Sequence, residues 1–524
     1  MSDDPAQALG APAPLPPLPA TVLERAELPL TDLGHASRIA AVYRHDVIYC
    51  CELGFGVWDG ARYDFGTTAE ARVLERCARL PDILREEVEQ WCAAPIPPDE
   101  IQLRLEQELR KSRAAFIDEE GAKRAIRADR RKRHEAEIKQ VGQVRKIASA
   151  AEALKFRLRV PFEAIDADPY AFHMANGVID LRRVLDSDPQ AFEREDDRRR
   201  EWLLGHDRAR LPSRASGVMF DPAAECPRWR DFIGLISSPA QGGFDVAMAA
   251  YFQRCFGRLV FGRNEPPTAF LLQGEGANGK STLMRILSEA LGSYGAHVPV
   301  AMFLDQGDEK ASSAAAPDEV RLPGARAYFA SEPRHGARLS DAKIKQLAGG
   351  DKRTSRPLYG APFEWFPIGH PVMAFNPMPT VAGADHGTFR RLIFLPFRRK
   401  LDELPPEARR TREEVEAELR AELPGIVNWL LAGLVDAMGP NGLNPPDDAL
   451  LFREAMLDDA DPVGNFMQAL IEEIHGHSIP MPELNKVAPF WMAENGYRNL
   501  RPTTIKKIML QRGYREGRSN GTKL

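Results

Sequence analysis

The sequence predicts an α/β protein whose parallel-sheet domain spans residues 264–400, with a mostly helical region before it and a helical, winged-helix-like region after it. Between Thr268 and Lys400, short apolar runs alternate with amphipathic runs, a pattern typical of parallel strands joined by crossover helices. A glycine-rich loop connects the first of these strands to the first helix. Two short helical runs and an Asn-Gly turn follow near the end of the chain, as in a winged helix.

Composition limits the class of protein without deciding it. The chain has 524 residues, 44% of them hydrophobic, which predicts three or four domains with sizeable cores. Its 70 Lys+Arg against 75 Asp+Glu give a net charge of −5, a balance that by itself argues against a nucleic-acid-binding protein. However, residues 104–146 carry a net +6 and residues 497–524 a net +7. The remainder is therefore strongly acidic, and DNA contact is expected only in these two segments and in a short hairpin near residue 360.

Cysteine usage and hydropathy favour a protein of the cytoplasm. None of the six cysteines forms a C-x-x-C pair, so a zinc ribbon or a disulfide scaffold is not expected. The first ten residues are acidic, unlike a signal peptide, and no apolar stretch reaches the ~18 residues of a membrane span.

The first half of the chain is divided by composition. Residues 1–29 form a proline-rich tail that is expected to be disordered, and 30–100 a small module with a helical run over Ala69–Trp91. Residues 101–155 form a charged helical connector, either a solvated helix with i,i+4 ion pairs or a phosphate-tracking surface. Residues 156–263 form a mixed collar domain, in which the Asp166-Ala-Asp168 pair is interpreted as structural. The parallel-sheet domain and a C-terminal domain, residues 401–524, complete the chain.

The glycine-rich loop carries the clearest chemistry. The strand Thr268–Gln273 is followed by a G-x-x-x-x-G-K-S motif and an amphipathic helix. Glycines let backbone N–H groups turn onto phosphate oxygens, and the helix N-terminus adds a positive dipole end. In this motif the lysine reaches the β- and γ-phosphates and the serine hydroxyl binds Mg²⁺. The sequence therefore predicts a nucleotide site at Gly274, Glu275, Gly276, Ala277, Asn278, Gly279, Lys280, Ser281 and Thr282.

Three later strands carry polar residues at their ends. The strand from Ala327 ends at Glu332, whose carboxylate could hold Mg²⁺ or orient the attacking water. The strand from Pro371 ends at Asn376, an amide that could polarise that water. Arg390 and Arg391 precede the strand Leu392–Phe397 and could stabilise the phosphoryl group in a neighbouring subunit, the alternative being a surface salt bridge.

A short hairpin around Tyr359–Pro362 combines cations on its first strand with aromatics on its second. Such a hairpin suits the phosphates and bases of a single strand, although its aromatics could equally belong to the core. The candidate DNA contacts here are Lys345, Arg353 and Arg356.

The C-terminal segment predicts a helix over Pro482–Glu494 and a second from Pro502 to Gly513, followed by a turn at Asn520-Gly521. This outlines either a winged helix that contacts DNA or a plain packing subdomain. Its candidate DNA contacts are Lys506, Lys507 and Arg512.

Taken together, the strings GEGANGKST, ASEP, KQLAGGD, FNPMP and FRR resemble the superfamily 3 helicase domain of phage and plasmid primase-helicases, relatives of the poxvirus primase-helicase. Segments outside the motor are similar too, so the resemblance covers roughly residues 30–524: Leu30–Ala36, Val57–Gly60, Asn176–Leu181 and Glu422–Trp429.

The resemblance implies an AAA+-like, ATP- and Mg²⁺-dependent motor that assembles as a ring, usually a homo-hexamer. Such a ring moves 3′→5′ on single-stranded or forked DNA, in the cytoplasm of a bacterial host and together with a separate primase or other replication proteins. By the same resemblance, the loop of Gly274–Thr282 matches Walker A, Glu332 the Walker B acid and Asn376 the sensor. One of Arg390 and Arg391 matches the arginine finger.

This sequence departs from the family pattern at two points. Ser331 stands where many Walker B motifs have a first acid, so either Glu332 alone serves metal and water or another acid such as Asp351 helps. No zinc-binding cysteines or metal-binding carboxylate set of a primase occurs in residues 1–150. The expectation is a replicative DNA helicase, with a ring-forming DNA-loading factor as the alternative.

Overall fold

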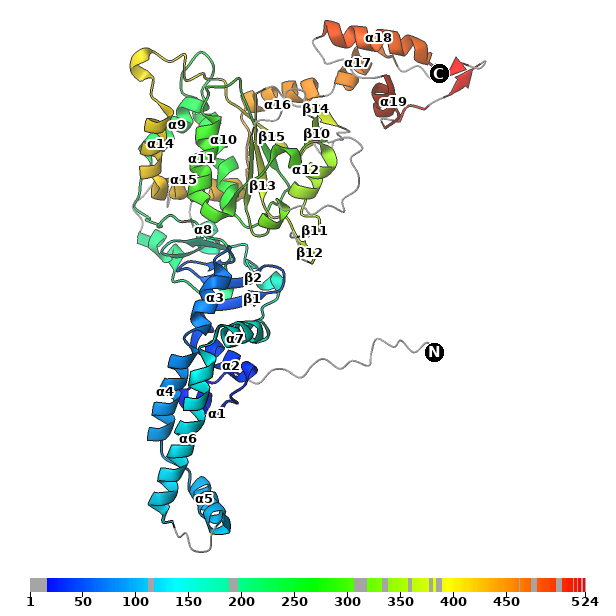
Figure 1. Ribbon diagram of the computed structural model, residues 1–524. Coiled ribbons are helices and arrows are strands. Elements are labelled where there is room, and N and C mark those ends of the chain that lie inside the picture. Colours follow the sequence, from blue (N-terminus) through cyan, green and yellow to red (C-terminus); the bar gives the residue numbers. More distant parts are fainter. Residues whose placement is uncertain are drawn as a thin grey trace. The chain divides into compact units, whose positions relative to one another are not determined.

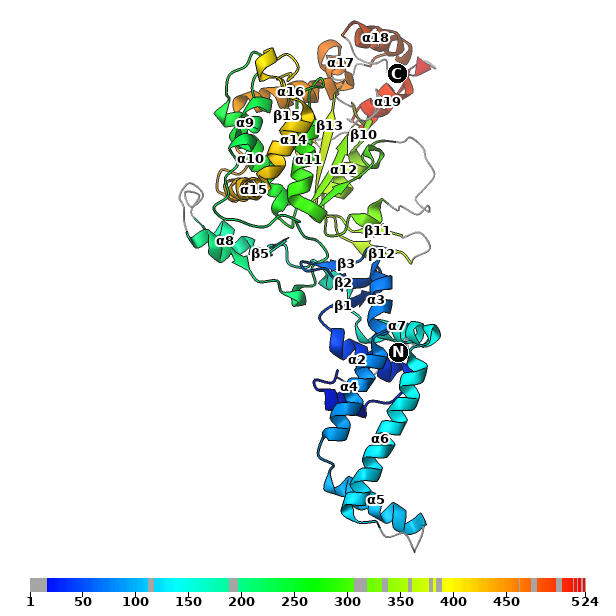
Figure 2. The same cartoon turned by 60° about the vertical axis from the view of Figure 1, so that its left-hand side comes forward.

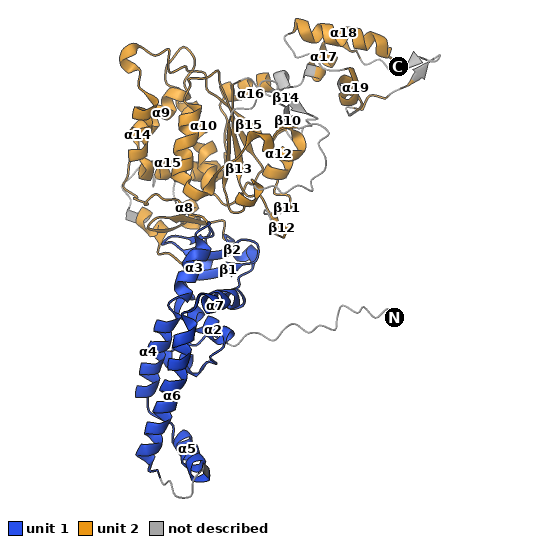
Figure 3. Cartoon of the chain, in the orientation of Figure 1, with its two compact units in different colours: residues 1–167, 208–213 blue, residues 168–207, 214–524 orange. Residues whose placement is uncertain are grey.

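The protein is described by a computed structural model (Figure 1). It describes residues 17–111, 117–187, 197–305, 318–331, 338–356, 361–376, 380–382, 389–460, 462–472, 478–495, 502–511, 513–515, 517–519 and 522–523. The chain divides into two compact units (Figure 3). Unit 1 comprises residues 1–167 and 208–213, and unit 2 comprises residues 168–207 and 214–524.

Unit 1 combines a small antiparallel sheet with seven helices among its described residues. Figure 2 shows α4 and α6 running side by side, with α5 packed at one end of α6. The long helix α6 begins at an Asp118 cap that accepts a hydrogen bond from Gly121 N, and Glu119 and Glu120 complement the dipole of its first turn. The elements are α1 Val22–Glu27, α2 Asp32–Tyr43, β1 Val47–Cys50, β2 Gly54–Trp58, β3 Tyr63–Asp64, α3 Ala69–Cys77, α4 Leu80–Ala93, α5 Pro98–Lys111, α6 Glu119–Val141 and α7 Val144–Arg157.

A buried ion pair ties the helices of unit 1 together. Arg38 of α2 and Glu87 of α4 are both fully buried, with Nε 2.8 Å from the carboxylate. Arg38 also donates to the carbonyl oxygens of Pro29 and Leu28, so it fixes the start of α2 as well. Burial raises the pKa of Glu87, and the guanidinium of Arg38 opposes that rise.

The expected helical run over Ala69–Trp91 is two helices rather than one. α3 ends at Cys77 and α4 begins at Leu80, with Ala78 and Arg79 between them. Pro81 occupies the first turn of α4, where the missing N–H costs nothing, so the sequence restarts a helix there.

Unit 2 is built on a five-stranded parallel sheet in the order β15-β7-β13-β9-β8. This confirms the parallel α/β domain. Figure 1 shows α10 and α11 on one side of the sheet and α12 on the other. The elements are β7 Ala269–Gln273, α11 Lys280–Leu291, β8 Gly295–His297, β9 Ala327–Ser331, α12 Asp341–Ala348, β13 His370–Phe375 and β15 Leu392–Pro396.

The first strand of the sheet, β7, lies between two other strands, β15 and β13. From β7 the chain continues to β8 at the far edge, returns through β9 and β13, and then passes β7 to reach β15. In open parallel sheets, ligands bind outside the carboxyl ends of the strands where the order reverses. The loop after β7 lies at such a position.

Further elements of unit 2 flank this sheet. The antiparallel strands β4, β5 and β6 form a second sheet, β10 pairs with β14, and β11 pairs with β12. These elements are β4 Ala171–Met174, β5 Gly177–Asp180, α8 Leu181–Leu185, β6 Leu203–Leu204, α9 Pro227–Ile236, α10 Val246–Gly257, β10 Arg338–Ser340, β11 Arg353–Ser355, β12 Phe363–Trp365, β14 Thr380–Ala382, α14 Arg412–Ala421, α15 Leu423–Met438 and α16 Asp447–Ala460.

The C-terminal part contains the two helices and the small hairpin that the sequence predicts. Val463 and Phe466 of α17 pack with Leu484, Ala488 and other buried residues of a separate small core. The elements are α17 Pro462–Leu470, α18 Met481–Glu494, α19 Pro502–Gln511, β16 Arg518–Ser519 and β17 Thr522–Lys523. The winged-helix interpretation stays a prediction.

Within the described ranges, no single helix has both the length and the apolar content of a membrane span. The helices α14 and α15 reach those limits only as a pair, across a bend of 75°.

Two glycines let α10 and α15 approach very closely. A Cβ atom at Gly433 would lie 2.2 Å from the carbonyl oxygen of Gln253, and a Cβ atom at Gly257 would lie 2.3 Å from the backbone of Gly433. Neither helix can accept a side chain here without moving, because the obstructing atoms are backbone.

We expect Gly433→Ala to lower the free energy of unfolding by about 1–3 kcal/mol through overpacking, despite the better helix propensity of alanine. Chemical denaturation measures the change. Gly217→Ala is the matched control, since a Cβ atom there meets nothing within 4 Å. Equal stability of the two variants would contradict the close helix crossing.

Candidate nucleotide site

The loop between β7 and α11 has the backbone of an anion-binding nest. Gly276, Ala277 and Gly279 have φ values of 95°, 47° and 85°, all in the left-handed region. Such conformations bring successive N–H groups to one concave side, where they bind phosphate or other anions. Ala277 adopts this conformation against the preference of a residue with a Cβ atom, so its neighbours must hold it there.

Packing around the loop admits glycine alone at two positions. A Cβ atom at Gly274 would lie 2.4 Å from the carbonyl oxygen of Phe397, and one at Gly279 would lie 2.7 Å from Ile236 Cγ2. The loop is therefore pressed against the end of β15 and against α9. Neither contact could be expected from the motif, because both partners are distant in sequence.

Lys280 is buried in the middle of this loop. Lys280 follows Gly279 as the first residue of α11, and it is only 6% exposed. The ammonium donates to the carbonyl oxygen of Gly274 at 2.7 Å and to Asn278 Oδ1 at 2.8 Å. Both acceptors are neutral, no described carboxylate forms an ion pair with the ammonium, and burial lowers the pKa of Lys280 to about 8. A cation in this state fits an anionic ligand.

Asn278 connects the loop to the strand at the edge of the sheet. Its side chain is buried and donates through Nδ2 to the carbonyl oxygen of Phe397 at 2.9 Å. Nearby, Leu401 N donates to Ala277 O at 2.7 Å, and Lys400 lies 3.1 Å from the Glu275 carboxylate. The segment after β15 thus braces the loop. Sequence reasoning missed this role of Phe397–Leu401.

Ser281 and Thr282 occupy the first turn of α11 but differ in exposure. Ser281 is exposed, whereas Thr282 is 9% exposed. The hydroxyl of Ser281 therefore lies at an accessible helix N-terminus, where a Mg²⁺ ligand would be needed. Among the residues that the structure describes, no group of three or more His, Cys, Asp or Glu side chains could hold a metal ion.

Asn376 lies next to this loop, at the carboxyl ends of the strands. It is exposed, directly after β13, and its carbonyl oxygen accepts a hydrogen bond from Gln273 Nε2 at 3.3 Å. Gly274 N in turn donates to Phe375 O. The predicted acid Glu332 lies outside the described residues, but the strand before it, β9, ends at Ser331 in register with Ala374.

Arg390 and Arg391 lie at the opposite edge of the same sheet. Ala269 N, at the start of β7, donates to Arg391 O at 2.8 Å, whereas the nucleotide loop follows the end of β7. Five strand residues separate these backbone positions by about 16 Å. The backbone of the two arginines therefore lies at the amino ends of the strands, whereas the nucleotide loop of the same chain lies at their carboxyl ends.

The predicted hairpin exists, and its aromatics belong to the core. β11 and β12 pair antiparallel with Ser355 opposite Phe363. Phe363 and Trp365 are buried, and Trp365 Nε1 donates to Ser355 Oγ at 2.8 Å. Only Phe366, beyond the strand, is largely exposed among the described aromatics of this hairpin. Of the two alternatives that the sequence left open for the hairpin aromatics, the structure supports core packing for Phe363 and Trp365, because the short strand turns both rings inward.

The candidate DNA-binding cations have different surroundings. Arg353 pairs with the carboxylate of Glu319 at 2.5 Å, and Lys345 lies 3.0 Å from Asp341. Arg356 is exposed, as is Asp351. On α19, Lys507 is exposed and Lys506 half-buried, whereas Arg512 lies outside the described residues.

The D-x-D pair before β4 is engaged in local structure, as predicted. Asp166 accepts a hydrogen bond from Ser213 N at 2.8 Å. Asp168 accepts two from the guanidinium of Arg182, at 2.8 Å and 3.2 Å.

Comparison with known proteins confirms the resemblance to primase-helicases. Residues 36–238 match the family described as D5 N terminal like. A protein of Acanthamoeba polyphaga mimivirus named "Putative helicase" is 33% identical over 153 residues, and one of Frog virus 3 with the same designation is 25% identical over 157 residues. Each alignment covers 29% of this chain and 16% of the relative, so the chain matches only about a sixth of their length.

Among solved structures, the apo A form of the NrS-1 C-terminal region is similar with 13% identity and a TM-score of 0.34, covering 60% of this chain and 78% of that one. A second apo structure of the same region has 12% identity and the same TM-score.

The lowered pKa of Lys280 predicts pH-dependent nucleotide binding. Below about pH 8 the side chain is charged and ready for phosphate, whereas above that pH binding must first protonate it. We therefore expect ATP affinity to be constant from pH 7 to about 8 and then to fall by up to about tenfold per pH unit.

Calorimetry in buffers of different ionisation enthalpy measures the accompanying proton uptake. Lys280→Arg is the control, because a guanidinium stays charged throughout this range. Unchanged ATP affinity of the natural protein between pH 7 and 9.5, with no proton uptake, would contradict this account of Lys280.

Proposed function

We propose that this protein is an ATP-driven DNA helicase that works as a ring, usually a hexamer, in the replication of a phage or other mobile element. The observation that carries the proposal is the buried ammonium of Lys280, whose hydrogen-bond acceptors among the described residues are two neutral oxygens, inside a nest-like loop at the carboxyl ends of a parallel sheet. The match to a D5 N terminal like family and the similarity to viral proteins named as helicases support DNA replication as its context.

In this proposal, the side chains around the loop divide the work of hydrolysis. Lys280 leaves Gly274 and Asn278 to neutralise the phosphates, and Ser281 supplies the hydroxyl that holds Mg²⁺. When bound there, Mg²⁺ would supply positive charge that offsets the negative charge developing on the phosphates. Glu332 and Asn376 orient the water, and the position of Asn376 beside Gln273 supports that role.

The same proposal assigns Arg390 and Arg391 to the nucleotide of an adjacent subunit. Their place at the amino ends of the strands, about 16 Å from the carboxyl ends, supports action on another chain rather than on their own. A positive charge supplied across a subunit boundary stabilises the transferring phosphoryl group. One chain alone would then hold an incomplete site.

For contact with single-stranded or forked DNA, the proposal uses the exposed cations Arg356 and Lys507, with Lys506 and Arg512 on the same C-terminal segment. Lys345 and Arg353 already have acidic partners in the chain, so they would have to exchange those partners for phosphate. The second candidate is a ring-forming DNA-loading factor without unwinding activity, for which these two cations could stay paired if the other cations hold the DNA.

Strand displacement on a forked substrate with a 3′ tail separates the two candidates. Unwinding that requires ATP supports the helicase, whereas DNA-stimulated ATPase without strand displacement supports the loading factor. ATPase activity that is insensitive to DNA would contradict both.

We expect Lys280→Ala to lower DNA-stimulated ATPase by at least about a hundredfold, because the phosphate charge is no longer neutralised. Steady-state phosphate release measures it, with removal of Mg²⁺ by EDTA expected to give a similar loss. Undiminished turnover in the variant would rule out the loop as the hydrolytic site. Lys155→Ala, at a surface lysine paired with Glu152, is the control.

Mixing two inactive variants tests the action of the arginines on a neighbouring chain. We expect Lys280→Ala protein mixed with an Arg390→Ala/Arg391→Ala protein to regain part of the ATPase activity, since some interfaces then combine an intact loop with intact arginines. No recovery, in a mixture shown by light scattering to co-assemble, would contradict catalysis across the subunit boundary.

A further inference from the structure

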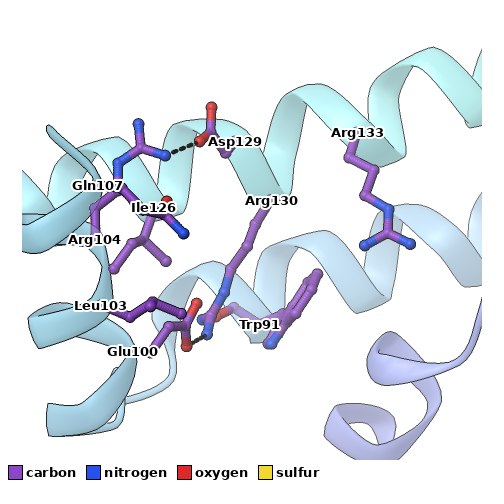
Figure 4. A pocket seen from close by; sticks show the side chains of 9 residues that line it. All are labelled: Trp91, Glu100, Leu103, Arg104, Gln107, Ile126, Asp129, Arg130 and Arg133. Atoms are coloured by element: carbon purple, nitrogen blue, oxygen red, sulfur yellow. Dashed lines mark hydrogen bonds and ion pairs between the residues drawn. The ribbon is translucent and has the colours of Figure 1, made fainter. Parts of the chain in front are cut away.

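The charged helix α6 of unit 1 carries two kinds of cation. One kind faces its neighbours and is neutralised. Arg130 is 8% exposed, binds Glu100 at 2.6 Å and lies 4.5 Å from the centre of the Trp91 ring. Figure 4 shows this pair, together with a second one between Arg104 and Asp129 at 2.7 Å, around a cavity of about 290 Å³. These cations serve the packing of α4, α5 and α6.

The other kind faces away from the packed side and has no acidic partner. Arg131, Lys132 and Lys139 are exposed, and none of them takes part in an ion pair or a side-chain hydrogen bond with another described residue. At 100° per residue they cluster opposite the buried stripe of the helix. That stripe consists of Ala122, Ile126, Arg130, His134 and Val141.

The outward face of α6 carries mostly positively charged side chains. Arg124 extends it by about two turns, so that cations follow the helix for about 22 Å from Arg124 to Lys139. Between Arg124 and Lys139, Glu135 is the one acid on this face; it lies three or four residues from Arg131, Lys132 and Lys139, yet it forms an ion pair with none of them. Lys123, on another side of the helix, differs because its ammonium is joined to Glu119 and Glu120 by ion pairs of the kind that stabilise helices. The outward cations therefore call for an anionic partner outside the chain.

We propose that the outward face of α6 binds the phosphate backbone of duplex DNA. Duplex rather than single-stranded DNA is indicated because proteins that bind single strands add aromatic side chains on which bases stack, and α6 contains no Phe, Tyr or Trp. A straight cationic helix without aromatics is instead suited to rows of phosphates at fixed spacing, contacted regardless of sequence. The inference takes DNA as the polymer from the proposed function and adds a second DNA site, outside the motor.

Duplex binding by the full-length chain tests this inference. The variant Arg131→Gln/Lys132→Gln/Lys139→Gln removes three outward cations. The matched control Arg85→Gln/Lys123→Gln/Lys155→Gln removes three cations of the same unit that are already paired with Asp82, Glu120 and Glu152. Both variants change the net charge equally, and circular dichroism checks that both fold.

Fluorescence anisotropy with a labelled blunt duplex, titrated at several salt concentrations, gives the affinity and its salt dependence. We expect the outward variant to bind the duplex at least about tenfold more weakly at about 0.1 M salt, with a slope of log K against log salt reduced by about 2–3. The control should keep the natural affinity and slope. Nucleotide binding at Lys280 should be unchanged in both variants.

Two results would overturn the inference. One is an outward variant that binds duplex as the control does, in which case the face serves an acidic protein or no partner. The other is an equal loss of affinity for the single strand of the same length, which would make the face a single-strand site. Failure of the Lys280→Ala test leaves these measurements intact, so the two proposals can fail separately.

Discussion

The buried ammonium of Lys280 is the constraint on which the arrangement of the sheet domain depends. A cation that is 6% exposed and bound only to two neutral oxygens is costly to hold, and its pKa falls accordingly. The surrounding chain supplies what keeps it there. Asn278 is bound to the end of β15, and glycines at 274 and 279 let the loop approach β15 and α9. The domain thus stores an unsatisfied charge at a position suited to an anion.

Parallel strand order explains why one chain would hold only part of such a site. All five strands run parallel, so the residues that follow the strands lie at one end of the sheet (the first edge) and the residues that precede them lie at the other end (the second edge). The loop and Asn376 belong to the first edge, whereas Arg390 and Arg391 belong to the second. In the proposed helicase, a ring in which the second edge of one subunit meets the first edge of the next would bring them together.

Much of the sheet domain could be predicted because its strands are short, apolar and separated by recognisable turns. The strands β7, β9, β13 and β15 begin and end within one or two residues of the predicted positions. The hairpin shows the limit of that reasoning. Alternation of cations and aromatics at β11 and β12 fitted both a DNA surface and a core, and only the pairing of Ser355 with Phe363 shows that the rings face inward. The break between α3 and α4 was within reach of the sequence, because Pro81 favours a new helix start at that point.

The sequence by itself determined the order of strands and helices, the glycine-rich loop and the presence of two basic segments, because these follow from local spacing and composition. Only the tertiary structure decided which charges are free. It paired Arg353 with Glu319 and Arg130 with Glu100, which are 34 and 30 positions apart in the sequence. It also paired Lys345 with Asp341, four positions away. It left Arg131, Lys132 and Lys139 on an outward helix face, and it buried Lys280 in a loop where its acceptors among the described residues are neutral. Charge becomes available for binding only where folding brings no opposite charge within reach, and that depends on contacts between distant parts of the chain.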